Sequence, residues 1–167
     1  MVPTADIEAL KALLHQLVGK KPWRAVIGGG SYLALYFGQP VTMGLRGRAR
    51  GEWTLALSGC VWRIDEEGSV FVGSEDARPR LKAAVPRLEG LSVLSVRLET
   101  RALDAVLEFE GGLTLRSFAV ESGGGESWLL YTPGNMVAVV GPGPHWIHKS
   151  STGSGAQAGD QEPGLSP

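Results

Sequence analysis

The sequence predicts an α+β domain, a mostly antiparallel sheet with two helices packed on it. Apolar residues recur at helical spacing in two segments, and elsewhere they alternate with a period of two. Glycine supplies 24 of the 167 residues, and short glycine turns separate the alternating stretches. Because parallel strands need long crossover connections, these turns favour antiparallel hairpins, curved or folded into a sandwich or barrel.

The first helix is expected to begin at Thr4 and to end at Gly19, since threonine caps helix N-termini and glycine adopts the left-handed C-terminal conformation. The second is expected to run from Ser74 to Gly90, and Pro86 should kink or shorten its last turn. The apolar faces would carry Ile7, Leu10, Leu14 and Leu17 in the first helix, and Leu81, Ala84, Val85 and Leu88 in the second.

About nine or ten strands are expected between and after these helices. Their ranges are 24–27, 32–37, 53–57, 61–64, 70–72, 91–98, 103–109, 113–120, 128–131 and 136–140. Residues 38–51 are rich in glycine and arginine and are expected to form a long loop. We expect a single domain over residues 1–148, followed by a disordered tail over residues 149–167, which has almost nothing to bury.

The spacing of matching residues also suggests a tandem duplication of a helix-plus-five-strand unit, with pseudo-repeats at about 5–74 and 75–142. The matched pairs are Leu10 with Leu81, Gly19 with Gly90, Leu35 with Leu107, Phe37 with Phe109, and Trp62 with Trp128. A helix followed by hairpins is a common pattern, so two unrelated segments could give the same spacing. If the duplication is real, the two units should pack about a pseudo-two-fold axis and share one core.

Composition excludes several classes of function. Lysine and arginine total 16 against 17 acidic residues, which argues against a protein held to nucleic acid or an anionic membrane by its overall charge. The single cysteine, Cys60, excludes an internal disulfide and a thiolate zinc cage. No apolar run approaches the roughly 20 residues that cross a bilayer, and the first residues do not resemble a signal peptide. We therefore expect a cytoplasmic protein.

Reactive motifs are weak. A strand is expected after Gly28-Gly29-Gly30, whereas a phosphate loop leads into a helix, so these glycines are assigned to a hairpin turn. His145 and His148 lack the further ligands of a metal site, and Cys60 has no neighbouring base. We expect no catalytic, cofactor-binding or metal-binding residue. An enzyme that uses Glu108, Glu110 or His145 in an unseen pocket stays open as an alternative.

The candidate partner-binding residues are Arg46, Arg48 and Arg50 in the expected loop, together with Trp146. Three guanidinium groups on one loop could bind phosphate or an acidic partner, so a nucleic-acid or nucleotide binder is a further alternative. A flexible, solvated loop explains the same residues without a function. Trp146 could equally close the edge of the core, and the other four tryptophans fit core packing or an exposed partner surface.

Three stretches resemble small uncharacterised bacterial proteins of unknown function, over residues 23–143. They are the run from Gly30 to Gly38, the strand from Cys60 to Ile64, and the segments around residues 128–133 and 139–143. Some similar bacterial domains act as immunity partners of toxins, so the resemblance implies a protein-binding role. We expect a non-catalytic protein that binds an unknown protein partner, in an oligomeric state that the sequence leaves open.

Overall fold

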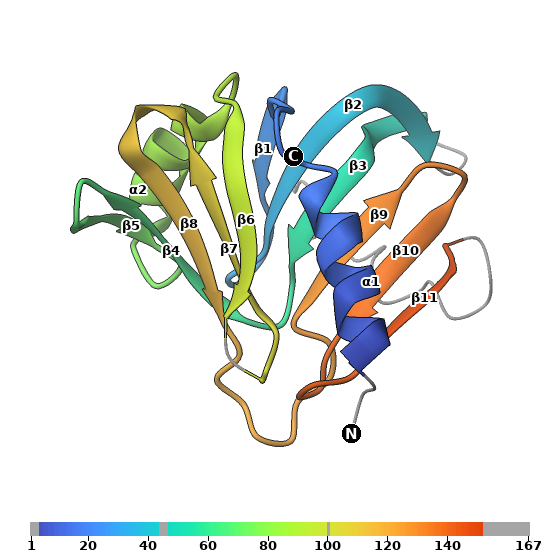
Figure 1. Ribbon diagram of the computed structural model, residues 1–167. Helices are drawn as coiled ribbons and strands as arrows, with labels where there is room; N and C mark the ends of the chain where they lie inside the picture. Colours follow the sequence, from blue (N-terminus) through green and yellow to red (C-terminus); the bar gives the residue numbers. More distant parts are fainter. Residues whose placement is uncertain (1–3, 44–46, 100, 152–167) are drawn as a thin grey trace.

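The computed structural model describes residues 4–43, 47–99 and 101–151, and it confirms the α+β prediction with two antiparallel sheets that face each other (Figure 1). Sheet A consists, in order, of β1 (Arg24–Ile27), β2 (Leu33–Met43), β3 (Arg48–Leu57), β9 (Trp128–Thr132), β10 (Met136–Val140) and β11 (Trp146–Ser150). Sheet B consists of β5 (Ser69–Gly73), β4 (Val61–Glu66), β8 (Leu113–Phe118), β7 (Asp104–Phe109) and β6 (Val93–Glu99).

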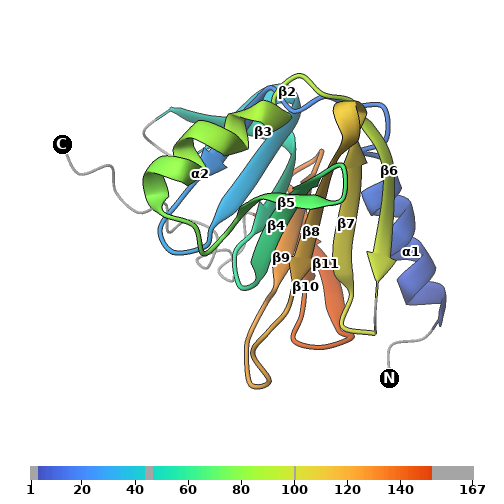
Figure 2. The ribbon, with the colours of Figure 1, turned by 90° about the vertical axis from the view of Figure 1, so that its left-hand side faces the viewer.

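The two helices lie on opposite sides of the pair of sheets (Figure 2). Helix α1 (Thr4–His15) contacts β6, whereas α2 (Arg78–Ala84) continues into a 3-10 turn (Val85–Leu88) that contacts β1. The second helix is shorter than expected at both ends. Ala77 is its N-cap, while the hydroxyl of Ser74 accepts a hydrogen bond from the backbone N–H of Trp62. Pro86 lies in the 3-10 turn, so the α-helix ends before it.

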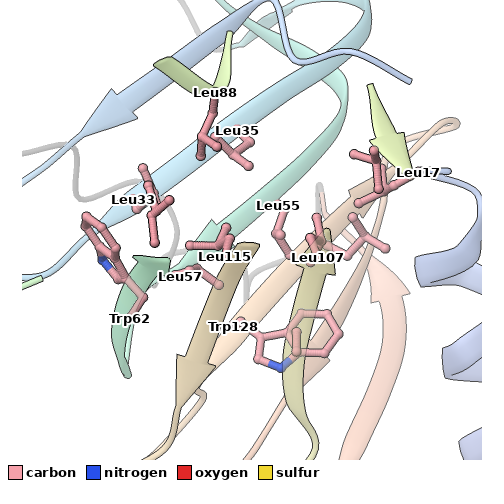
Figure 3. Packing of buried hydrophobic residues seen from close by; sticks show 14 of the residues in the cluster. Leu17, Leu33, Leu35, Leu55, Leu57, Trp62, Leu88, Leu107, Leu115 and Trp128 are labelled. Atoms are coloured by element: carbon pink, nitrogen blue, oxygen red, sulfur yellow. The ribbon is translucent and has the colours of Figure 1, made fainter. Parts of the chain in front are cut away.

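The main core fills the space between the sheets (Figure 3). Period-two alternation explains its composition, because every second residue of a strand points to the same face. Sheet A contributes Leu33, Leu35, Phe37, Leu55, Leu57, Trp128 and Leu130, and sheet B contributes Trp62, Ile64, Leu107, Phe109 and Leu115. Leu10, Leu14 and Leu17 of the N-terminal segment and Leu81, Val85 and Leu88 of the second helical segment close the core at its open sides.

The expected long loop over residues 38–51 was wrong. Strand β2 continues to Met43 and β3 begins at Arg48, with Val41 opposite Arg50 in the pairing. Alternating side chains continue along both arms, so the hairpin extends in spite of its glycines. The pairing is irregular between Phe37 and Pro40, and Pro40 lies opposite Gly51. A Cβ added at Gly51 would overlap the backbone of Phe37 and Trp53, so glycine is required there.

Strand β11 extends two residues beyond residue 148, where the sequence analysis ends the domain. In β11, Lys149 pairs with Val137 and Ser150 pairs with Met136 of β10. The prolines and glycines of residues 141–144 precede this strand and obscured its short alternation. Residues 152–167, the rest of the expected tail, lie outside the described ranges.

The strand orders of the two sheets correspond to each other. Five is added to the numbers of β1, β2 and β3 and subtracted from those of β9 and β10. The order β1-β2-β3-β9-β10 of sheet A then becomes β6-β7-β8-β4-β5, which is the order of sheet B. Each half of the chain therefore supplies three strands to one sheet and two to the other. β11 is the additional strand, next to β10.

Hydrogen bonds repeat in the same way. The indole N–H of Trp62 donates to the carbonyl of Ser31 at 2.6 Å, and that of Trp128 donates to the carbonyl of Leu103 at 2.9 Å. The N–H of Gly19 bonds the carbonyl of Val93, and the N–H of Gly90 bonds that of Pro22, both at 2.8 Å. These contacts join the glycine after the helical segment of each half to the other half, at the start of β6 and two residues before β1. Within the described chain, no helix is long and apolar enough to span a membrane.

Candidate interaction surface on sheet A

The outer face of sheet B is a network of compensating charges. Asp65 bonds both Arg63 and Arg116 at 3.0 Å, and Arg97 bonds both Glu99 and Glu108 at 2.9 Å. Hydrogen bonds from Arg97 and Ser95 lower the pKa of the Glu108 carboxyl. Such a charge network is exposed to solvent, and its positive and negative side chains compensate one another.

The outer face of sheet A is apolar and aromatic instead. A second hydrophobic cluster lies there, separate from the main core, with three further side chains packed against it. We call this set the sheet A outer face: Ala34, Tyr36, Ala56, Leu129, Val137 and Val139, with Val26, Tyr32 and Tyr131. No helical residue whose side chain the structure describes belongs to it, and the buried side chains of both helices belong to the main core.

The two outer faces carry different side chains at positions that correspond in the shared strand order. On sheet A, Tyr36 pairs with Thr54, which pairs with Tyr131. On sheet B, Glu108 pairs with Thr114, which pairs with Asp65. The tyrosines of one sheet thus occupy the positions of carboxylates in the other. The contrast cannot come from topology, since the topology is shared, so it comes from the side chains at these positions.

Arg50 is buried at the edge of this face. Its side chain is 5% exposed, its guanidinium lies 4.4 Å from the centre of the Tyr131 ring, and its Nη1 donates to the carbonyl of Gly51 at 2.8 Å. Burial lowers the pKa of this guanidinium. Over the ranges that the structure covers, no carboxylate lies within ion-pair distance of Arg50.

Two other arginines lie near the same face. Burial raises the pKa of the Tyr36 hydroxyl, and the positive charges of Arg24, Arg50 and Arg48 oppose this effect. Arg24 is directly across from Tyr36 in the strand pairing. The sheet A outer face therefore combines an apolar centre with a cationic rim.

The structure describes three of the four expected partner-binding residues. Arg48 and Arg50 lie in β3 rather than in a loop, and Arg46 falls outside the described residues. Trp146 packs against the main core, on the opposite face of β11 from the exposed Ile147. Its buried indole Nε1 has no hydrogen-bond partner among the residues that the structure describes. This placement favours Trp146 as a core-edge side chain.

The residues considered for catalysis or metal binding are dispersed. Glu108 belongs to the charge network of sheet B, Glu110 accepts the N–H of Ser92 at 2.7 Å, and His145 is exposed before β11. Burial, with a smaller contribution from the charge of Asp104, raises the pKa of the Cys60 thiol to about 12. Across the described ranges, no group of three His, Cys, Asp or Glu side chains could hold a metal ion.

A groove of about 550 Å³ lies between α1 and β6. Its charged side chains are already engaged, since Lys11 pairs with Glu8 at 3.2 Å and Arg97 belongs to the charge network. Among the described residues, His15 is the one ionisable side chain of the groove outside these pairs. The sheet A outer face stands out more clearly as a candidate site.

A sequence signal for the sheet A outer face existed. Strands β9 and β10 read WLLYT and MVAVV, with apolar residues at consecutive positions rather than at alternate ones. Such runs indicate burial on both faces of a strand. Strand β4, which reads VWRIDE, alternates as expected for a strand with one solvated face.

Comparison with known protein families, with curated proteins and with solved structures found no match to this chain. The resemblance to small bacterial proteins gains no support from these comparisons. The surface chemistry of the fold is therefore the basis for a functional proposal.

Proposed function

We propose that this chain is a non-catalytic binding protein that contacts another protein through the sheet A outer face. The observation that carries the proposal is the apolar and tyrosine-rich chemistry of this face, at positions where sheet B holds a charge network. A cytoplasmic, immunity-like role in a bacterium is the finer part of the same proposal.

The chemistry of the surface suits protein recognition. Tyrosine and arginine are enriched at the energetic centres of interfaces, where a rigid aromatic ring supplies area at small entropic cost. Arg50 stacked on Tyr131 forms such a pair, and its position is fixed by the bond to Gly51. The cationic rim favours a partner segment that carries carboxylates beside its apolar side chains.

Neither of the other candidate functions has an independent observation in its favour. Arg50 is held against Tyr131 and is nearly excluded from solvent, so a phosphate backbone would not reach it as it would reach an open arginine loop. Glu108 is engaged by Arg97, and Cys60 is protonated at neutral pH because of its raised pKa. We therefore do not propose nucleic-acid binding or catalysis.

We also propose that the two units arose by tandem duplication. The repeated sheet order and the matched bonds of Trp62 and Trp128 support this origin. The charge network would then mark the outer face that stayed solvated, and the sheet A outer face would mark the one that diverged for binding.

Site-specific photo-crosslinking in the native host tests the binding proposal. Ile147, 55% exposed, pairs with Val139 at the sheet A outer face, and Val70, 61% exposed, pairs with Asp65 at the outer face of sheet B. A photoreactive amino acid in place of Ile147 is expected to give one dominant protein adduct, and the same group at Val70 is expected to give none. Equal adducts from both positions, or no adduct from position 147, would reject the proposal.

A further inference from the structure

A small cavity of about 80 Å³ lies beside Arg50, between the β2–β3 hairpin and the β9–β10 turn. Val41, Arg50 and Glu52 line it from the hairpin, and residues 132–135 line it from the end of β9 and the turn. One water molecule takes about 30 Å³ in the liquid, whereas a cavity of about 150 Å³ holds a benzene ring. The cavity therefore suits a group of a few heavy atoms and is too small for a base or a sugar.

Arg50 brings a positive charge without a counter-charge to this cavity. Its Nε donates to the sulfur of Met43 at 2.9 Å, and its Nη1 donates to the carbonyl of Gly51 at 2.8 Å. Both acceptors are neutral, and over the described ranges no carboxylate lies within ion-pair distance of Arg50. A guanidinium has about five N–H donors, so most of them stay without an acceptor among the described residues. Water compensates little of this charge, because Arg50 is only 5% exposed.

Thr132 contributes a hydroxyl to the same cavity. The residue is 5% exposed, and its Oγ1 lies 3.2 Å from Nε2 of His148 in β11. In the tautomer in which Nε2 carries the proton, the imidazole donates to the hydroxyl oxygen and leaves the hydroxyl hydrogen for another acceptor. A guanidinium from β3 and a hydroxyl from β9 thus supply hydrogen-bond donors to one small space.

These donors match a carboxylate. The guanidinium is a planar fork of N–H groups, which binds the two oxygens of a carboxylate side by side. A carboxylate and the methylene that carries it are few enough atoms for a volume of about 80 Å³. An acidic side chain of a protein presents this group at the end of a narrow stem, so it can enter where a bulkier ligand cannot.

Glu52 favours a carboxylate over a phosphate. It lines the cavity, and one of its oxygens accepts the backbone N–H of Gln39 in β2 at 3.2 Å. Glu52 lies outside ion-pair distance of Arg50, so it leaves the guanidinium free to bind another group. Its negative charge repels a doubly charged phosphate more strongly than a singly charged carboxylate.

The cavity adjoins the sheet A outer face. The guanidinium of Arg50 stacks at 4.4 Å on the ring of Tyr131, which belongs to that face. A protein bound to the face therefore reaches the cavity with one side chain. A partner without a carboxylate at this point would leave the guanidinium buried and unpaired, and this penalty discriminates against it.

We propose that this cavity binds a single carboxylate, held by Arg50 and Thr132, and that an aspartate or glutamate side chain of the protein partner supplies it. The second half of this statement rests on the proposed function. The first half does not, because a free carboxylate tests the cavity in the protein alone.

Acetate is a free carboxylate of suitable size, and its titration into the full chain by NMR tests the cavity. Sodium acetate replaces sodium chloride at constant ionic strength. The Nε–H signal of Arg50 and the backbone amide signals of Gly134 and Asn135 are expected to shift and to saturate. The Nε–H signal of Arg97, which two glutamates of sheet B already hold, is expected to stay in place.

Two substitutions and a second anion show whether the binding is specific. Arg50→Gln should abolish the shifts of the turn amides. Thr132→Val should weaken acetate binding by about tenfold, because it removes a hydrogen bond to a charged group and keeps the shape of the side chain. It also keeps the test decisive if Arg50→Gln does not fold. Inorganic phosphate should bind at least about tenfold more weakly than acetate.

Three results of the titration would overturn the carboxylate site. The acetate shifts could fail to saturate, acetate could bind equally well to Arg50→Gln and Thr132→Val, or phosphate could bind more tightly than acetate. Each of these results would remove the first half of the proposal and leave the proposed function to its own crosslinking test.

Crosslinking from position 147 tests the source of the carboxylate. Arg50→Gln should lower the yield of the protein adduct by about tenfold, and Arg97→Gln, which removes the same charge from sheet B, should leave it unchanged. If acetate binds and the adduct persists in Arg50→Gln, the cavity takes a free carboxylate and the second half is wrong. If no adduct forms even with Arg50 present, the proposed function fails, and the acetate titration still decides the first half.

Discussion

Replacement of Trp128 by alanine is expected to lower the free energy of unfolding by about 3–5 kcal/mol, a large part of the stability of a domain of this size. The indole is 0% exposed in the core between the sheets, so its removal leaves a cavity (Figure 3). The substitution also leaves the buried carbonyl of Leu103 without the hydrogen bond that the indole N–H donates at 2.9 Å. Urea unfolding followed by circular dichroism measures the loss.

Substitutions of two other tryptophans give losses of stability with which this one can be compared. Trp62→Ala should cost a similar amount, because Trp62 is 2% exposed and makes the matching bond to Ser31. Trp23→Ala should cost much less, since that indole is 40% exposed at the edge of sheet A. If Trp128→Ala were no more damaging than Trp23→Ala, the proposed core would be incorrect. Trp128→Phe retains most of the buried volume and keeps the comparison measurable if the alanine variant does not fold.

Fragments comprising residues 1–75 and 76–167 are each expected to be unfolded alone and to fold when mixed in a 1:1 ratio. In either fragment the first three strands belong to one sheet and the next two to the other. The pairings of β3 with β9 and of β4 with β8 join the two fragments, so each one alone lacks the strands that complete its sheets. Near-ultraviolet circular dichroism and sedimentation of the separate and mixed fragments measure the association.

A cut elsewhere provides the control for this experiment. Division within the β4–β5 turn, at Glu67 and Gly68, leaves β5 with the wrong fragment and should reduce the yield of the reconstituted complex. A fragment of residues 1–75 that unfolds cooperatively as a monomer would contradict the exchanged-sheet topology. It would show instead that each half is a domain in its own right.

Local patterns were sufficient for most of the secondary structure. The ten expected strands correspond to β1–β10, since alternation and glycine turns act over a few residues. The extension of the β2–β3 hairpin was missed because glycine and arginine composition suggested a loop, although the backbones pair as far as Met43 and Arg48. The partners of β3 and β4 could not be predicted, because pairing between distant strands depends on the whole chain and not on a local period.

The candidate site was harder to predict for a related reason. Arg48 and Arg50 were singled out, but as loop residues, and the tyrosines that surround Arg50 were not connected with them. Tyr36 and Tyr131 are far apart in the sequence and come to one face only because β3 lies between β2 and β9. The apolar runs of β9 and β10 indicated two-sided burial, yet what lies on the second face depends on tertiary structure.

The affinity of the crosslinked partner for two matched variants tests the central claim, that the two outer faces have different roles. Tyr131→Ala and Asp65→Ala change equivalent positions of sheet A and sheet B. The dissociation constant should rise by about tenfold or more for Tyr131→Ala, because tyrosine at the centre of an interface often contributes over 1.4 kcal/mol, and stay within about twofold for Asp65→Ala. Equal weakening by both variants, or weakening by Asp65→Ala alone, would contradict the claim.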